Sequence, residues 1–303
     1  MLDLFSTMMW YLNRRIRITS FLLLLTSYPF ACAPNTIYDT RSTLPTFLFD
    51  YDLCWSDEFN GVELDESKWG YRDPGKRGDA IETKEAVSVS DGVLSINTHT
   101  DENGVHKTGM IGTQDRFMQK QGYWEARIKF DDRPGMHSAF WLQSPTIGKP
   151  IDSPKKAGVE IDIVEHRKHD GNGIDIESIL EMALHWDGYG DHHQFVGSIV
   201  DEKQLQNGKW NTYGVLWDDN RYNFYFNRNK IWTYEGEAIS NRSQYIIFSS
   251  EVKNNSWAGI IPKDGYICDN EAKMQVDYVR VYLQNINETS SCLEYNRQII
   301  SSQ

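Results

Sequence analysis

Val159-Glu160-Ile161-Asp162-Ile163-Val164-Glu165 is a short stretch in which acids are interleaved with aliphatic residues, most of them β-branched. β-branched residues favour strands, and strand side chains alternate between two faces, so Glu160 and Asp162 should share a face. Glu165 comes five residues after Glu160 and would point to the other face of a regular strand. A β-bulge at Ile163-Val164 would insert one residue and turn Glu165 back to the first face. We therefore predict a bulged strand with three carboxylates on one face and aliphatic side chains on the other.

The sequence on both sides of this stretch predicts further strands. The turn signal Asp91-Gly92 separates two apolar runs, which together predict a hairpin over residues 87–98. Alternation of apolar and polar residues predicts strands at 124–130, 213–217, 222–226 and 274–283. Many alternating strands joined by turns indicate an all-β fold, a β-sandwich or jelly roll, formed by one domain over residues 47–286.

The net charge of the chain indicates whether nucleic acid could be a partner. The chain has 303 residues and a net charge of −12. A nucleic-acid-binding protein needs a basic surface that neutralises phosphates. Lysines and arginines are scattered here, and the only basic cluster is Arg14, Arg15 and Arg17. The sequence therefore argues against nucleic acid as a partner.

The basic cluster precedes an apolar segment, residues 18–31, and this order is typical of a secretory signal. The segment is too short for a membrane-spanning helix, which needs about 20 residues. We expect a signal peptide over residues 1–33, a linker over 34–46 and a C-terminal tail over 287–303. Ala31-Cys32-Ala33 fits an ordinary cleavage site, but it also fits a lipoprotein signal with a lipid anchor on Cys32. Both alternatives predict a protein that is secreted or attached to the cell envelope, extracellular or periplasmic.

The chain contains four cysteines, and they are Cys32, Cys54, Cys268 and Cys292. Their spacing shows no close pairs of the kind that bind metals. Export would permit a disulfide, but the spacing leaves the pairing open.

Three acids on one strand face are unfavourable for stability, because neighbouring like charges raise one another's pKa. Such crowding is useful if one carboxyl group must stay protonated near neutral pH. Retaining glycoside hydrolysis needs this combination, an ionised nucleophile and a protonated acid about 5–5.5 Å apart. The alternative is a solvated acidic edge of a sheet, and the three acids alone do not decide between the two interpretations.

Several ordered blocks, over about residues 50–285, resemble glycoside hydrolase family 16. The bulged signature of that family is Glu-x-Asp-x-x-Glu within aliphatic residues, and residues 160–165 match it at every position. The other blocks, in the order of the family, are Asp57–Gly61 with Leu64-Asp65 and Lys68-Trp69, Gly122–Lys129, Ala139–Leu142, His185-Trp186 and Met274–Tyr282. The resemblance implies a β-jelly roll with an open cleft on its concave face. It also implies a retaining β-glycosidase that cuts within a polysaccharide chain, its expected partner.

The resemblance assigns roles to the three acids. Glu160 aligns with the nucleophile and Glu165 with the general acid/base. Asp162 aligns with the residue that holds the charge state of the nucleophile. The implied mechanism is a double displacement, in which a glycosyl-enzyme forms and is then hydrolysed. It requires no metal and no other cofactor, and we expect the protein to act as a monomer.

The resemblance also indicates substrate-binding residues, and these are Trp141, His185, Trp186 and His137. Trp141 matches a tryptophan that stacks on sugar, and strand alternation separates it from Phe140 and Leu142, which should face the core. Trp124 shares its parity with apolar neighbours and is expected in the core. The histidine pairs His166 with His169 and His192 with His193 are expected to be solvated loop residues rather than metal ligands.

A structural calcium ion is an open alternative away from the cleft. Some family members bind one through acids such as those that match Glu58 and Asp277, and calcium prefers hard oxygen ligands. Two carboxylates alone do not make such a site.

The chain departs from the family members that cut β-1,3-glucans. Those members usually carry Trp-Pro shortly before the signature and again at the start of the aromatic strand. Here residues 148–158 contain no tryptophan, and His137-Ser138 stands at the second position. The substrate therefore stays open between a β-glucan and an algal galactan such as agar, porphyran or carrageenan.

A sulfated galactan would need lysine or arginine in the cleft. The basic residues that flank the signature are Lys149, Lys155, Lys156 and Arg167. The competing class of function is a carbohydrate-binding surface protein without turnover. Such a protein has no use for three crowded acids, so we favour the enzyme. A structural surface protein is a third class, and the absence of repeats argues against it.

Overall fold

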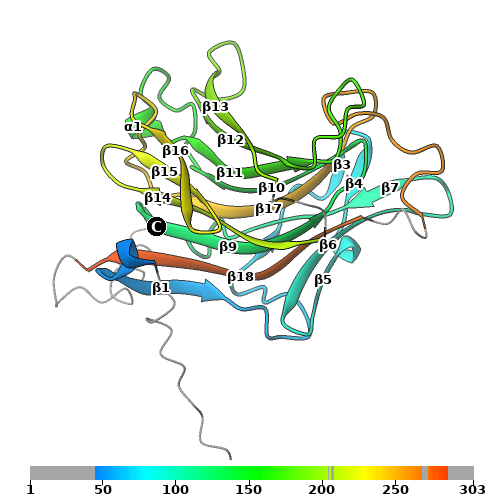
Figure 1. Ribbon diagram of the computed structural model, residues 1–303, viewed down its shortest axis with the longest axis horizontal. Helices are drawn as coiled ribbons and strands as arrows, with labels where there is room; N and C mark the ends of the chain where they lie inside the picture. The colour runs from blue at the N-terminus through cyan, green and yellow to red at the C-terminus, as the bar shows by residue number, and fades with distance from the viewer. Residues whose placement is uncertain (1–44, 204, 206–207, 268–271, 286–303) are drawn as a thin grey trace, which may run out of the picture. The chain divides into compact units, whose positions relative to one another are not determined.

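The structure, a computed structural model, describes residues 45–203, 205, 208–267 and 272–285 (Figure 1). The predicted signal peptide, nearly all of the predicted linker and the predicted tail lie outside these residues, as do Cys32, Cys268 and Cys292. Cys54 is disulfide-bonded. Within the described ranges, no helix has the length and apolar character that crossing a membrane requires.

The described residues form two β-sheets. The strands of the first sheet are β1 (Tyr51–Asp57), β3 (Gly75–Arg77), β4 (Ala80–Glu82), β5 (Val87–Ser90), β6 (Val93–Thr100), β7 (His106–Thr108), β9 (Gly122–Asp131), β14 (Trp210–Trp217), β15 (Tyr222–Phe226), β16 (Asn229–Tyr234) and β18 (Ala272–Gln284). They are ordered β16-β15-β14-β9-β18-β6-β7-β4-β3, with β1 beside β18 and β5 beside β6.

The second sheet carries the predicted signature. Its strands are β2 (Gly70–Tyr71), β8 (Met110–Gly112), β10 (Met136–Gln143), β11 (Glu160–Arg167), β12 (Ile179–Trp186), β13 (Gln194–Asp201) and β17 (Tyr245–Val252). They are ordered β13-β12-β11-β10-β17-β8-β2. The described helical segments are short, and they are η2 (Thr46–Leu48), η3 (Lys84–Ala86) and α1 (Pro154–Ala157).

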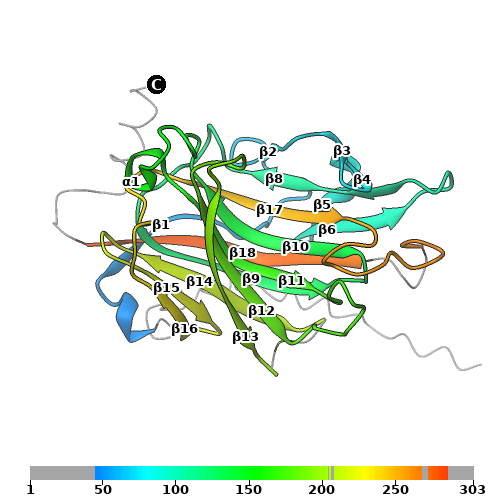
Figure 2. The same cartoon turned by 90° about the horizontal axis from the view of Figure 1, so that it is seen from above.

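The two sheets pack as a sandwich. Figure 1 shows β10, β11, β12 and β17 in one layer above β9 and β18 in the other, and Figure 2 shows β10 and β17 lying along the long strand β18. The prediction of an all-β sandwich is confirmed. The predicted hairpin is also confirmed, because Asp91 and Gly92 join β5 to β6 with φ values of 52° and 75°, as a tight hairpin turn requires.

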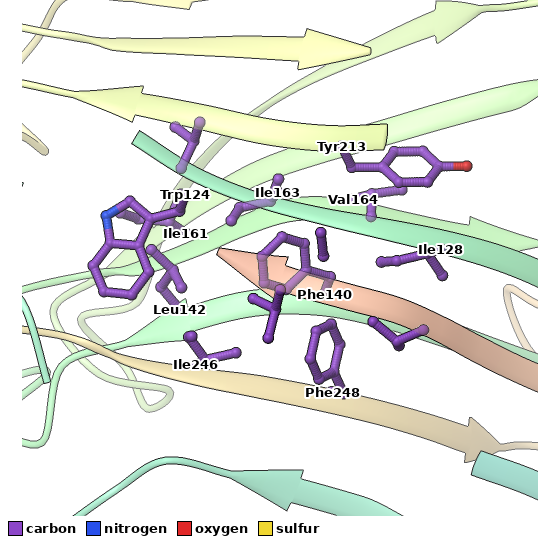
Figure 3. Close-up of a cluster of buried hydrophobic side chains, with 14 of the residues drawn as sticks. Trp124, Ile128, Phe140, Leu142, Ile161, Ile163, Val164, Tyr213, Ile246 and Phe248 are labelled. Carbon is purple, nitrogen blue, oxygen red and sulfur yellow. The ribbon is translucent and has the colours of Figure 1, made fainter. Parts of the chain in front are cut away.

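Apolar side chains from both sheets fill the space between them (Figure 3). Phe140 on β10 stacks on Phe248 of β17 with ring centroids 5.0 Å apart, and Ile161 on β11 is fully buried. Trp124 on β9 is also fully buried, so its predicted core position is confirmed. This packing fixes the inner face of β10 and β11, and their outer face is left for the site.

Candidate active site

The predicted bulge is present in β11. Asp162 pairs with Ala183 of β12, but Glu165 pairs with Glu181, so three steps along β11 match two steps along β12. The register with β10 also shifts at this point. The extra residue returns the side chain of Glu165 to the face that carries Asp162, and the prediction of three carboxyl groups on one face is confirmed.

The three carboxyl groups line a cleft with a volume of about 540 Å³. The other residues that line it are Arg72, Asp73, Arg77, Met110, His137, Ala139, Trp141, Gln143, His185, Tyr189, Ser249, Glu251 and Trp257. With the three acids, the lining residues come from five neighbouring strands of the second sheet, β8, β17, β10, β11 and β12, from β3, which carries Arg77, and from loops. The cleft therefore runs across the strands.

Glu160 is buried at one wall of the cleft, with 8% of its surface exposed. Its Oε2 accepts a hydrogen bond from the hydroxyl of Tyr189, and another of 3.0 Å from Nε2 of Gln143. Tyr245 donates in turn to Gln143, which orients the amide. Burial and the nearby charge of Asp162 raise the pKa of Glu160 to about 8, although the hydrogen bonds from Tyr189 and Gln143 favour the ionised form.

Asp162 is buried beside two histidines. Its Oδ2 lies 3.2 Å from Nε2 of His185, and Nδ1 of His185 lies 2.9 Å from Nε2 of His193. Burial and the charge of Glu165 raise the pKa of Asp162 well above its ordinary value. His193 lies in the loop before β13 and is half-buried, in agreement with the expectation of a loop residue, and its ring stacks on His185 at 5.1 Å. His192, the neighbour of His193, is exposed as expected.

Glu165 stands at the opposite wall. Its Oε1 lies 3.1 Å from Nε2 of His137, and the ring of His137 packs against Trp257 with centroids 4.5 Å apart. Burial raises the pKa of Glu165, but the hydrogen bond and charge of His137 outweigh this effect, and the net shift is downward. The interaction with His137 therefore favours the ionised form of Glu165.

Arg167 supports this wall at the end of β11, opposite His137 of β10. Its guanidinium group pairs with the carboxylate of Glu181, donates to the backbone carbonyl of Trp257 and lies 4.2 Å from the Trp257 ring centroid. The arginine is 8% exposed. It positions Trp257. The sequence had suggested Arg167 as a cation for a sulfated substrate, but its guanidinium group is already engaged.

His166 lies on the core side of β11, and its prediction as a solvated loop residue was wrong. The side chain has no exposed surface, its Nδ1 lies 2.8 Å from Oδ2 of Asp132 and its Nε2 lies 3.1 Å from the Glu177 carbonyl oxygen. Its ring stacks on Phe130 at 4.7 Å. The bulge explains the error, because it sends position 166 inward when position 165 faces the cleft.

The predicted substrate-binding residues divide between the two faces of the sheet. Trp141 lies on the cleft face, and its Nε1 donates to Oγ of Ser249 at 3.0 Å. His137 and His185 also line the cleft. The prediction for Trp186 was wrong, since this side chain packs in the core. It follows His185 directly on β12, and successive strand residues point to opposite faces.

Several lining residues were missed by the sequence analysis, among them Gln143, Tyr189, Trp257, Arg72 and Arg77. None belongs to the signature. Tyr189 and Trp257 come from loops, and only the tertiary structure brings them to β11. Gln143 could have been found, because it follows Trp141 at the spacing of two that places strand residues on one face.

Among the described residues, one group of side chains has the spacing of a metal site. Glu160, Asp162 and His185 offer one ligand atom each within 4.8 Å of one another. The prediction that the chemistry requires no metal stays a prediction. Glu58 is paired with Arg280 at 2.7 Å and Asp277 with Arg127 at 2.7 Å, so each carboxylate of the predicted calcium site has a cationic partner.

The chain matches a known protein family over most of its length. Residues 53–284 match the family model described as "Beta-porphyranase A-D, GH16 domain". The chain belongs to glycoside hydrolase family 16. The resemblance of the signature to this family is thereby confirmed.

Two curated relatives and one solved structure illustrate the range of this family 16 domain. The chain is 28% identical to "Glucan endo-1,3-beta-glucosidase A1" of Niallia circulans, over 76% of this chain and 38% of that protein. It is 26% identical to "Keratan-sulfate endo-1,4-beta-galactosidase" of Sphingobacterium multivorum, over 77% and 55%. The chain thus spans about half the length of these relatives, or less. The crystal structure of porphyranase B from Zobellia galactanivorans superposes with a TM-score of 0.62 at 21% identity, over 77% of this chain and 92% of that one. This likeness shows the fold and confirms the jelly roll.

Proposed function

We propose that this family 16 domain is a retaining, endo-acting β-glycosidase, and that its substrate is a sulfated β-galactan of the porphyran type. The observation that carries the proposal is the bulged strand, which places Glu160, Asp162 and Glu165 along one open cleft. The cleft runs across the strands, and this geometry suits a long chain that is cut internally.

Glu160 is the nucleophile in this proposal. It must be ionised when it attacks the anomeric carbon, and the donors Tyr189 and Gln143 stabilise that form against the cost of burial. Burial and the charge of Glu165 raise the pKa of Asp162 strongly, which favours a proton on Asp162 when Glu160 ionises and so limits the repulsion between the two carboxyl groups. A covalent glycosyl-enzyme on Glu160 follows, with retention at the anomeric carbon.

Glu165 protonates the leaving oxygen and later activates water. In this proposal one proton is shared between Oε1 of Glu165 and Nε2 of His137, which lie 3.1 Å apart, and it can reside on either group. A bound sugar displaces water from Glu165, and desolvation disfavours the ionised carboxylate. Substrate binding therefore moves the shared proton to Glu165, where the reaction needs it.

The cations in the cleft support an anionic substrate. Arg72 donates to Gln114 at 2.7 Å, and its Cζ lies 5.1 Å from the Tyr245 ring centroid. Arg77 pairs with Glu251 at 2.5 Å. Both residues line the cleft with Asp73 and Glu251, but Nε and Nη2 of Arg77 already donate to Glu251, so Arg72 is the candidate partner for sulfate oxygens, to which a guanidinium group is well suited. The description of the matching family model names porphyranases, and the name of one curated relative contains keratan sulfate. Both names also favour a sulfated galactan.

We further propose that the protein is exported through residues 1–33, either released or anchored by a lipid on Cys32, and that it acts as a monomer without a required cofactor. An extracellular polysaccharide is too large to enter a cell intact, which supports export.

The test is a substrate panel with product sizing. Purified protein is incubated with porphyran, agar, carrageenan, laminarin and mixed-linkage glucan. We expect the fastest cleavage with porphyran and a ladder of even-sized oligosaccharides at early times. Faster cleavage of laminarin would overturn the sulfated galactan. Binding of polymers without any product from the whole panel would favour the carbohydrate-binding alternative.

A further inference from the structure

A row of residues crosses the second sheet at the level of Asp162. Asp162 pairs with Trp141 on one side and with Ala183 on the other, and Ala183 pairs with Gly197 of β13. Residues that are directly opposite in antiparallel strands point to the same face. Beyond Asp162, the cleft face therefore continues over alanine and glycine, the two smallest residues, as far as the sheet edge at β13.

Larger apolar side chains stand on both sides of this low floor. Phe195 pairs with His185 and Ile199 pairs with Glu181, so Phe195 and Ile199 flank Gly197 on the same face. Each of the two is 68% exposed. Phe195, Gly197, Ile199 and Ala183 are called the β13 trough below.

The core fixes the orientation of these side chains. Val196 and Val200 alternate with them along β13 and pack against the main hydrophobic cluster. A slip of one residue would bury Phe195 and expose the valines, so the register is well determined. At position 197, a Cβ atom would lie only 3.0 Å from the Met182 carbonyl oxygen. Glycine thus relieves a crowded position and keeps the floor low.

The β13 trough adjoins the catalytic cleft through the ring of His185. The Phe195 ring lies 5.9 Å from the His185 ring with an interplanar angle of 20°, and 6.1 Å from the His193 ring with an angle of 19°. His185 lines the cleft and contacts Asp162. A nearly parallel series of rings therefore leads from the catalytic acids to the sheet edge at β13, which lies beside β12 in Figure 2.

We propose that the β13 trough binds the part of the polysaccharide that leaves the cleft on the side opposite Arg72 and Arg77, and that it takes an uncharged sugar unit there. This inference rests on the proposed function. Aromatic and aliphatic side chains in a concave site bind the apolar faces of sugar rings. The cleft-face residues of β13 include no cation, and Asp201 at its end would repel a sulfate group. The two arms of the cleft thus differ in chemistry, because one carries charged side chains, Arg72 and Arg77 beside Asp73 and Glu251, and the other is apolar.

The test uses the variants Phe195→Ala and Ile199→Ala, alone and combined. Both side chains are exposed, so the fold should be retained, and the Tm checks this. Phe49→Ala is the matched control, because Phe49 is 67% exposed and follows η2, whose Phe47 and Leu48 pack against tyrosines of the first sheet. The measurement is kcat/KM on neutral and sulfated galactan oligosaccharides of increasing length.

For the wild-type protein, kcat/KM should rise with the length of the oligosaccharide until the β13 trough is filled. The kcat/KM of the double variant should fall about 10-fold on the longest oligosaccharides and stay within about twofold of wild type on the shortest. Added salt should change kcat/KM by the same factor in the double variant and in wild type. Phe49→Ala should match wild type at every length. An unchanged length dependence in the double variant overturns the β13 trough while the proposed function stands. A wild-type protein that cleaves no galactan overturns the proposed function itself, and the β13 trough with it.

Discussion

Replacement of Tyr189 by phenylalanine removes a single hydroxyl group at the wall of the cleft. That hydroxyl donates to Oε2 of Glu160, the proposed nucleophile. Since the hydrogen bond favours the ionised carboxylate, its loss should raise the pKa of Glu160 further. The attack requires the ionised form, so the acid limb of the pH–activity profile should move to higher pH.

The size of the effect follows from the environment of Glu160. Burial and Asp162 already raise its pKa to about 8. A hydrogen bond to a charged group contributes about 1.5–3 kcal/mol, and Tyr189 is 59% exposed, so the lower end applies because solvent screens the interaction. About 1.4 kcal/mol corresponds to one pKa unit. Below its pKa, the ionised fraction falls about 10-fold for each such unit, and activity at pH 7 should fall by about this factor.

The assay is kcat/KM for Tyr189→Phe and wild type between pH 5 and pH 10, with Tyr234→Phe on β16 of the other sheet as a control. We expect the acid limb of Tyr189→Phe to lie about one pH unit above that of wild type, and activity to recover at alkaline pH. A loss of similar size at every pH would mean that Tyr189 binds substrate and does not control the ionisation of Glu160. That result would refute the electrostatic reasoning.

Three further predictions concern the reaction and the fold. Glu160→Gln should abolish hydrolysis while the Tm stays close to that of wild type, and turnover at the wild-type rate would remove Glu160 from the nucleophile role. NMR of the earliest products should show the β-anomer, since a double displacement retains configuration; an initial α-anomer would indicate inversion. Glu82 on β4 is 2% exposed, neither of its carboxylate oxygens has a hydrogen-bond partner within the described residues, and burial together with Glu251 raises its pKa to about 8. The folded state holds this proton more tightly than the unfolded state, so the stability that it contributes is lost as the pH rises from about 4.5 to about 8. Glu82→Gln should therefore raise the Tm at pH 9 more than at pH 5. Equal changes in Tm at both pH values would count against this explanation.

The sequence by itself determined the catalytic strand. The bulge in β11 could be predicted because the side-chain period of a strand is two, so acids that are five apart reach one face only with an inserted residue. The same alternation placed Trp141 in the cleft and Phe140 in the core. It could also have excluded Trp186, since His185 lies beside it on β12, but the resemblance to the family was applied to both residues alike.

Only the tertiary structure decided what surrounds the acids. Tyr189 and Trp257 reach Glu160 and His137 from loops, and backbone pattern gives no signal for where a loop places a side chain. Arg167 shows the same limit from the other side, because its charge suggested a sulfate ligand, yet the fold engages it with Glu181 and Trp257. Local alternation fixes the face on which a strand residue lies, whereas its partners depend on contacts between segments that are far apart in the chain.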